Sequence, residues 1–199
     1  MNLGENLLNW VARSQKQILF VLCGGIALFV FLAMATYWQN KKETDALTAL
    51  YQGKKDPALL QKVVQDYPRQ KAAAMALADI GSQQLADKNF DACAATYEKL
   101  VETIHHPYWR VLALHGAGTC WRGKKDYKKS AAFFDRAAKE PGNEAKGLSR
   151  FETLVSLQKA GDPSVQKGLE ELLNAKDLPH DLREKIEEEI LWLELQPAS

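Results

Sequence analysis

The sequence predicts an all-α protein, in which one N-terminal transmembrane helix precedes an α-solenoid of antiparallel helix pairs and a C-terminal capping helix. Three observations lead to this prediction. A long apolar run near the N-terminus carries no charge, and helix-forming residues fill the remaining chain between spaced Gly and Pro breakers. In addition, one pattern of large and small residues occurs twice.

Composition narrows the class of protein further. The chain has 199 residues, of which 46% are hydrophobic, so one ordinary domain and a short addition account for its length. A net charge of +1 argues against a nucleic-acid binder held by phosphate contacts. Three cysteines are too few for a small protein built on disulfides.

Residues 18–38 form the apolar run, which at about 1.5 Å per residue is long enough to cross a bilayer core of roughly 30 Å. Lys16 and Lys41 bracket the run, and Tyr37 and Trp38 lie at the end where aromatic rings favour the headgroup layer. We therefore expect an N-terminal tail over 1–17, a transmembrane helix over 18–38 and a helical domain over 39–199.

A cleaved signal peptide is the alternative interpretation of the same run. Ala33-Met34-Ala35 fits the small-x-small cleavage pattern, and Arg13 and Lys16 would supply the charged region. The length of the run and of the tail before it favour a permanent single-pass anchor. Lysines follow the run as well as precede it, so charge alone leaves the membrane orientation open.

Two segments of the predicted domain, Ala74–Val101 and Val111–Ala138, share the tetratricopeptide (TPR) pattern of large, large, small and large residues, followed by a small residue and an aromatic. The pattern predicts clear repeats at about 74–107 and 111–141 and a TPR-like domain in which each helix pair is buried by its neighbours. We expect Gly81 to face Cys93 and Gly118 to face Ser130, with an aromatic ring beside each small pair. The pattern positions in the two segments are Leu77, Ile80, Gly81, Gln84, Cys93 and Tyr97, and Leu114, Ala117, Gly118, Trp121, Ser130 and Phe134.

The flanking segments are predicted to be degenerate repeats or caps. Thr44–Gln52 pairs with Pro57–Tyr67 before the clear repeats, and Leu148–Ala160 pairs with Ser164–Ala175 after them. Asp181–Leu195 is expected to be an end cap with a solvated outer face. The Glu187–Glu189 run on this last helix is either a contact for a basic partner or part of the solvated face.

The concave face of the stack is the candidate partner-binding groove, and it would suit extended or helical apolar segments. The alternative is that several of these positions belong to the core of the stack. The predicted groove residues are Met75, Ala78, Ser82, Leu85, Leu112, His115, Thr119 and Arg122.

Cys93 and Cys120 fall on adjacent predicted helices, so they form either a disulfide or two buried thiols. The spacing of the histidines, among them His105 and His106, fits no metal site. Phosphate-loop and nucleophile motifs are also missing from the sequence, so we expect no catalytic, cofactor or metal site and no enzyme.

The chain resembles the YfgM-like family of membrane-anchored TPR proteins, which includes an ancillary subunit of the Sec translocon. The resemblance lies in the short tail, the single span ending in Tyr37-Trp38, the helical domain and the phrase ALADIGSQQLADKNFDACAATYEKL. It implies a single-pass protein of the bacterial inner membrane with a periplasmic domain. It also implies an adaptor that binds translocon subunits, a membrane-anchored chaperone and client segments, without catalysis.

Two other interpretations stay open at this point. The chain could be a structural TPR scaffold of another envelope assembly, such as the division or secretion machinery. Alternatively, it could be a TPR protein that faces the cytoplasm, which the lysines after the span permit.

Overall fold

A computed structural model of the chain describes residues 3–54, 56–68, 70–104, 106–176 and 178–195. Within these residues the chain forms nine α-helices and no β-strand, which confirms the all-α prediction. The helices are α1 (Leu3–Gly53), α2 (Pro57–Asp66), α3 (Lys71–Ala86), α4 (Phe90–Thr103), α5 (Pro107–Gly123), α6 (Tyr127–Lys139), α7 (Lys146–Lys159), α8 (Val165–Leu173) and α9 (His180–Leu195).

Helix α1 is 51 residues long, or roughly 77 Å, and contains one stretch long and apolar enough to cross a membrane. The expected separate helix Thr44–Gln52 is instead the last part of α1. No Gly or Pro lies between Trp38 and Gln52 to end the helix, so it continues. The expected boundary at residue 39 therefore falls inside a helix.

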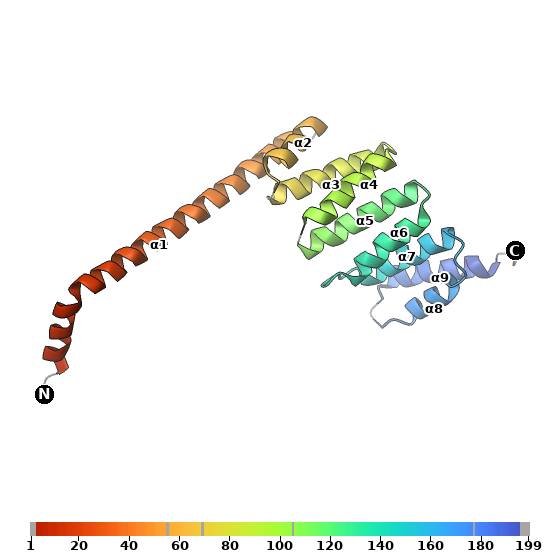
Figure 1. Cartoon of the computed structure of the whole chain (residues 1–199). Helices are drawn as coiled ribbons and strands as arrows, with labels where there is room; N and C mark the ends of the chain where they lie inside the picture. Colours follow the sequence, from red (N-terminus) through yellow and green to blue (C-terminus); the bar gives the residue numbers. More distant parts are fainter. Residues whose placement is uncertain (1–2, 55, 69, 105, 177, 196–199) are drawn as a thin grey trace.

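The end of α1 is built into the domain (Figure 1). Ala46 and Leu50 are buried in the main core, and α1 packs against both α2 and α3. An ion pair of 3.6 Å between Glu43 and Lys71 joins α1 to the start of α3. The apolar part of α1 thus reaches the domain without a flexible linker.

From α2 onward, each helix packs against the next one along the chain, and the helices form an elongated stack (Figure 1). Short connections make such neighbours antiparallel. Alternate helices also touch, since α3 contacts both α1 and α5, and α7 contacts α9.

The same tight turn links α3 to α4, α5 to α6 and α7 to α8. Its middle residue has a positive φ in each case: Lys88 (57°), Lys125 (62°) and Gly161 (78°). The following residue donates its N–H to the carbonyl five residues earlier, as Asn89 does to Gln84 at 2.8 Å. This is the Schellman ending of an α-helix, so the pair after the two clear repeats has the same helix-to-helix turn.

The residue that closes the turn also starts the next helix. Asn89 accepts a hydrogen bond from the N–H of Ala92 at 3.4 Å, and Asp126 accepts one from Lys129 at 3.1 Å. Such side-chain caps satisfy N–H groups that the first helical turn leaves free. Asn89 and Asp126 are therefore the N-cap residues of α4 and α6.

Small residues admit aromatic rings between the helices. A Cβ atom on Gly81 would lie 2.7 Å from the ring of Tyr97, and one on Gly118 would lie 2.9 Å from the ring of Phe134. The ring itself therefore covers each glycine, where we expected the small residue of the next helix to face it. Ser130 does reach Gly118, because its hydroxyl donates to the Gly118 carbonyl at 2.8 Å.

The buried apolar residues fall into two clusters. The larger runs from the end of α1 to α6, and the smaller joins α7, α8 and α9. Three fully buried serines, Ser130, Ser149 and Ser156, lie on α6 and α7 where the two clusters meet. Buried hydroxyl groups thus join apolar side chains such as Phe134 in the packing at this junction.

Helix α9 closes the stack as expected on its inner side. Leu182 and Ile186 are buried in the smaller cluster, and Ile190 and Leu193 pack against it. The outer face is exposed as expected, but it carries Leu191, Trp192 and Leu195 besides its charged residues. Successive residues of a helix are rotated by about 100°, so Leu191 and Leu195 lie on the side opposite the buried residues Leu182 and Ile186.

Candidate protein-binding hollow

A hollow of about 540 Å³ lies between α5, α7 and the loop that precedes α7. We call it the α5–α7 hollow. It is lined by Tyr108, Val111, Leu112, His115, Gly142, Asn143, Glu144, Ala145 and Leu148.

The walls of this hollow are mainly apolar and open to solvent. Tyr108 is 67% exposed, and Leu112 and Leu148 are each 39% exposed. Grouped apolar side chains that a chain leaves exposed mark surfaces that bind another molecule. The hollow is therefore suited to an apolar side chain or segment of a partner.

Two of the predicted groove residues, Leu112 and His115, line this hollow. The sequence analysis missed Tyr108 and Val111, although Tyr108 lies four residues before Leu112 and Val111 four residues before His115, on the same helix face in each case. It also missed Leu148, which comes from another helix and which no local pattern in α5 could indicate.

His115 fixes the polar end of the hollow. Its Nε2 lies 2.7 Å from the hydroxyl of Ser149, which also accepts a hydrogen bond from the Asn143 amide at 3.1 Å. The Ser149 hydroxyl donates to the carbonyl of Ala145 at 3.2 Å. These bonds are all satisfied when His115 carries its proton on Nε2.

Burial is the main cause that lowers the pKa of His115 below its ordinary value. Among the neighbouring charges, Glu152 raises this pKa and Arg122 lowers it. His115 is accordingly neutral at pH 7, which agrees with its short contact to a hydroxyl.

The His115–Ser149 contact has the distance of a nucleophile and its base, but Ser149 is fully buried. A nucleophile has to reach a substrate atom, so this pair does not form a catalytic site as it stands. Its evident action is to join α5 to α7 and the preceding loop, and this holds the hollow in shape.

Thr119 and Arg122 lie further along α5 and do not line the hollow. Arg122 forms an ion pair of 2.6 Å with Glu152 on α7, and its guanidinium lies 5.1 Å from the ring centroid of Phe134. The Thr119 hydroxyl donates to the His115 carbonyl at 2.9 Å. Arg122 therefore joins α5 to α7 beside the hollow, whereas the Thr119 hydrogen bond lies within α5 itself.

The four predicted groove residues on α3 lie in or beside the core. Ala78 is buried, and Met75 and Leu85 pack against the larger cluster. Ser82 is exposed, with its hydroxyl 3.1 Å from the hydroxyl of Tyr97. The structure thus does not bring the eight predicted residues together in one hollow.

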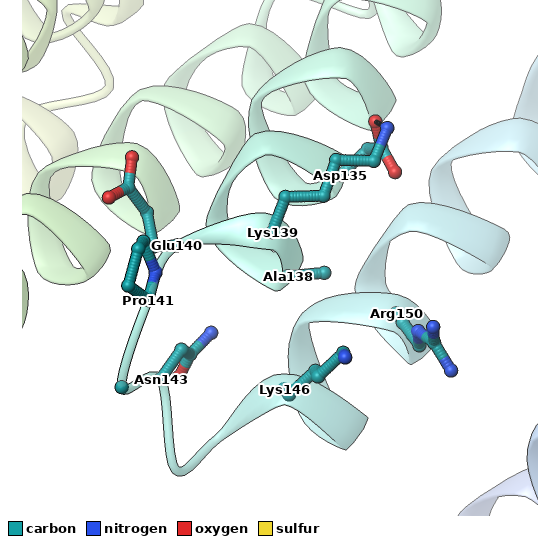
Figure 2. A pocket seen from close by; sticks show the side chains of 9 residues that line it. Asp135, Ala138, Lys139, Glu140, Pro141, Asn143, Lys146 and Arg150 are labelled. Carbon is teal, nitrogen blue, oxygen red and sulfur yellow. Dashed lines mark hydrogen bonds and ion pairs between the residues drawn. The ribbon is translucent and has the colours of Figure 1, made fainter.

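Two further hollows have a different character. One, of about 500 Å³, lies on the other side of the α6–α7 loop and is lined partly by Lys139, Lys146 and Arg150 (Figure 2). The other, of about 630 Å³, has buried core residues such as Ala74 and Leu77 in its lining. The first is polar and the second is backed by the core, so the α5–α7 hollow offers more exposed apolar side chains.

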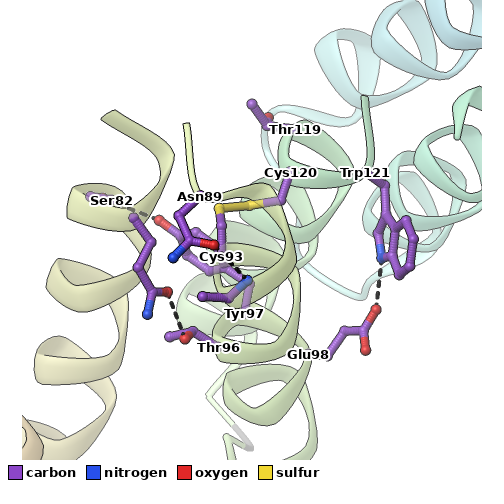
Figure 3. Close-up of a disulfide and its surroundings, with 12 residues drawn as sticks. Ser82, Asn89, Cys93, Thr96, Tyr97, Glu98, Thr119, Cys120 and Trp121 are labelled. Carbon is purple, nitrogen blue, oxygen red and sulfur yellow. Dashed lines mark hydrogen bonds between the residues drawn. A yellow bond between two sulfur atoms is a disulfide. The ribbon is translucent and has the colours of Figure 1, made fainter. Parts of the chain in front are cut away.

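Cys93 on α4 and Cys120 on α5 form a disulfide, with their Cα atoms 5.8 Å apart (Figure 3). Both cysteines are buried. Beside them, the indole N–H of Trp121 donates to Glu98 at 2.7 Å. Of the two states that the sequence left open, the structure contains the cross-linked one, and it ties the first clear repeat to the second.

The described ranges contain no group of three or more metal-ligating side chains. His105, one of the four histidines considered as ligands, lies outside the described residues. His106 precedes Pro107, the first residue of α5, and is the N-cap residue of that helix.

No family model matches this chain, and neither a curated protein nor a solved structure matches it.

Proposed function

We propose that this protein is a membrane-anchored, TPR-like adaptor of the YfgM-like family that binds segments of partner proteins. In this proposal it stands in the bacterial inner membrane with its helical domain in the periplasm. There it assists the Sec translocon and periplasmic chaperones with emerging envelope proteins. It acts by binding, and it catalyses no reaction.

The observation that carries the proposal is the exposed apolar lining of the α5–α7 hollow on a domain continuous with α1. Tyr108, Leu112 and Leu148 offer contacts to an apolar segment of a partner. Because α1 enters the domain core directly, the hollow stays close to the membrane. Confinement of this kind raises the effective concentration of the hollow at segments that leave a translocon.

The disulfide supports the periplasmic orientation. Disulfides persist in oxidising compartments such as the periplasm and are rare in the cytosol. Cys93 and Cys120 are both buried and joined, which suits a domain that matures outside the cytoplasm.

Protease treatment of spheroplasts tests the orientation. We expect residues 41–199 to be digested while the inner membrane is intact. Protection that is lost only on lysis would put the domain in the cytoplasm and refute the proposed location.

Site-specific photo-cross-linking tests the binding role. A photoreactive amino acid in place of Leu112 should cross-link to translocon subunits and to nascent envelope proteins. The matched control is Ala132, which is exposed on α6 and does not line the hollow. Equal cross-linking from the two positions, or adducts with division or secretion components alone, would contradict the proposal.

A further inference from the structure

The outer face of α9 carries a second apolar surface, distinct from the α5–α7 hollow. Leu191, Trp192 and Leu195 are 56%, 51% and 74% exposed. A helix that caps a helical stack normally turns a polar face to solvent. Three large apolar side chains on that face are therefore a departure that points to a partner.

The same face of α9 is acidic one to two helical turns before these apolar side chains. Glu184, Glu188, Leu191 and Leu195 follow one another at intervals of four, three and four residues, so they form one stripe along α9. Both glutamates are exposed. The stripe therefore runs from carboxylates near the start of the helix to apolar side chains near its end.

The charge on this helix is strongly one-sided. Its sequence contains six carboxylates, to which Arg183 and Lys185 are the two basic counterparts. Arg183 donates to the carbonyl of Leu173 and is half-buried, so it is engaged with the stack. His180 lies 3.4 Å from Glu184, and Glu188 lies on the same stripe one turn further on.

The arrangement of carboxylates and apolar side chains distinguishes between the molecules that could bind to this face. A parallel second copy of α9 on the same face would bring carboxylates against carboxylates, and an antiparallel copy would bury the carboxylates against Leu191 and Leu195 without a cation. An anionic lipid surface would repel the carboxylates as well. A segment with basic residues followed by an apolar stretch would pair its cations with Glu184 and Glu188. Its apolar side chains would then reach Leu191, Trp192 and Leu195.

We propose that the outer face of α9 is a docking surface for a protein segment in which Lys or Arg residues are followed by an apolar helical stretch. The carboxylates orient the segment, and burial of the three apolar side chains supplies most of the affinity. This surface does not share residues with the α5–α7 hollow, so either site can fail without the other.

Peptide binding to the full chain tests this proposal. The chain is placed in nanodiscs of zwitterionic lipid, and empty nanodiscs provide the background. The probe is a fluorescent helical peptide with two Lys residues one and two turns before a Leu-rich stretch. Its counterpart has Glu in place of each Lys. We expect the basic peptide to bind at least about tenfold more tightly than the acidic one, with an affinity that falls as salt is added.

Two variants locate the binding. Leu191→Ser with Leu195→Ser should weaken binding of the basic peptide by about tenfold or more, because apolar contact area is lost. Glu184→Gln with Glu188→Gln should weaken it several-fold and reduce its dependence on salt. These side chains are exposed, so the thermal midpoint of each variant should match that of the parent chain.

Leu47→Ser is the matched control, since it removes an exposed leucine of α1 that lies outside both surfaces and should leave the peptide affinity unchanged. Leu148→Ser, which alters the α5–α7 hollow, shows whether the peptide binds there instead. Equal affinity for the two peptides would overturn the proposal, as would a loss of binding in Leu148→Ser alone. Self-association abolished by the Leu191 and Leu195 substitutions would assign the face to a second copy. Recruitment of anionic vesicles through the same residues would assign it to lipid.

Discussion

The α4–α5 junction and the α6–α7 junction hold neighbouring helices together in different ways. At α4–α5 a buried disulfide joins the two helices, and the Tyr97 ring lies against glycines of both flanking helices, Gly81 and Gly116. At α6–α7 the hydroxyls of Ser130 and Ser156 meet at 2.9 Å inside the structure. One junction is covalent and apolar, and the other depends on hydrogen bonds between buried polar groups.

The difference shows which parts of the stack tolerate change. A ring packed against a glycine leaves no space for a larger residue, because an added methyl group collides with the ring. A buried hydrogen bond contributes less, but it requires both partners. The first junction should therefore be the more stable one, and the second should be the more sensitive to solvent conditions.

Removal of the disulfide should have the largest effect. The cross-link closes a loop with a sequence separation of 27, so the double variant Cys93→Ala with Cys120→Ala should lose about 3.5 kcal/mol of stability. Denaturant unfolding followed by circular dichroism measures the loss. Reductant should lower the midpoint of the parent chain but leave that of the variant unchanged. Cys23→Ser, which alters the exposed cysteine of α1, should unfold as the parent does.

Gly116→Ala should break the apolar part of the same junction. The new Cβ would collide with the Tyr97 ring, so the ring has to move, at a cost of about 1–3 kcal/mol. Thermal unfolding of the detergent-solubilised chain measures it. Gly24→Ala provides the control, because nothing lies within 4 Å of a Cβ there. A variant as stable as the parent would show that the Tyr97 ring is free to shift.

Ser130→Ala tests the polar junction. It removes the donor to the Gly118 carbonyl and the contact with Ser156, at a cost of about 1 kcal/mol. The measurement is again the denaturation midpoint, with Lys128→Ala, an exposed position on the same helix, as the control. A loss as large as that of the disulfide variant would mean that the comparison between the two junctions is wrong.

The smallest effect concerns pH. Because burial lowers the pKa of His115 in the folded state, the unfolded chain binds a proton more readily than the folded chain does. His115 therefore destabilises the fold as the pH falls from its unfolded pKa of about 6.5 towards the lower folded value, and it has no such effect above that range. Glu152 on α7 opposes this shift, and Arg122 on α5 adds to it.

His115→Gln keeps an amide that can donate to Ser149 but removes the titration. Between about pH 7.5 and about pH 5.5 the variant should lose less stability than the parent. Unfolding midpoints across this range provide the measurement. Parallel curves for the two proteins would assign the pH dependence to other groups.

Local chemistry explains why much of the fold was predictable. Asn89 and Asp126 are typical N-cap residues, and Pro107 is typical of the first position of a helix. Helix starts near these residues can therefore be predicted from the sequence alone. The continuation of α1 into the domain was missed, since the sequence pattern of Thr44–Gln52 matched a short helix equally well.

The candidate site was predictable only in part. Leu112 and His115 follow from the repeat pattern of α5, but Leu148 and Asn143 come from α7 and the loop before it. Their place in the hollow depends on how one helix pair stacks on the next, which the local spacing does not specify. The α3 residues fell into the core instead because the end of α1 packs against α3.

The unbroken α1 helix fixes the rotational position of the domain about the axis of the apolar segment. Each residue inserted between Trp38 and Glu43 would rotate the domain by about 100° around the axis of α1 and shift it by about 1.5 Å along that axis. Seven inserted residues would return the domain to within about 20° of its original rotational position and shift it by roughly 10 Å along the axis of α1. The direction in which the α5–α7 hollow faces, relative to the apolar segment, is thus set by the length of α1.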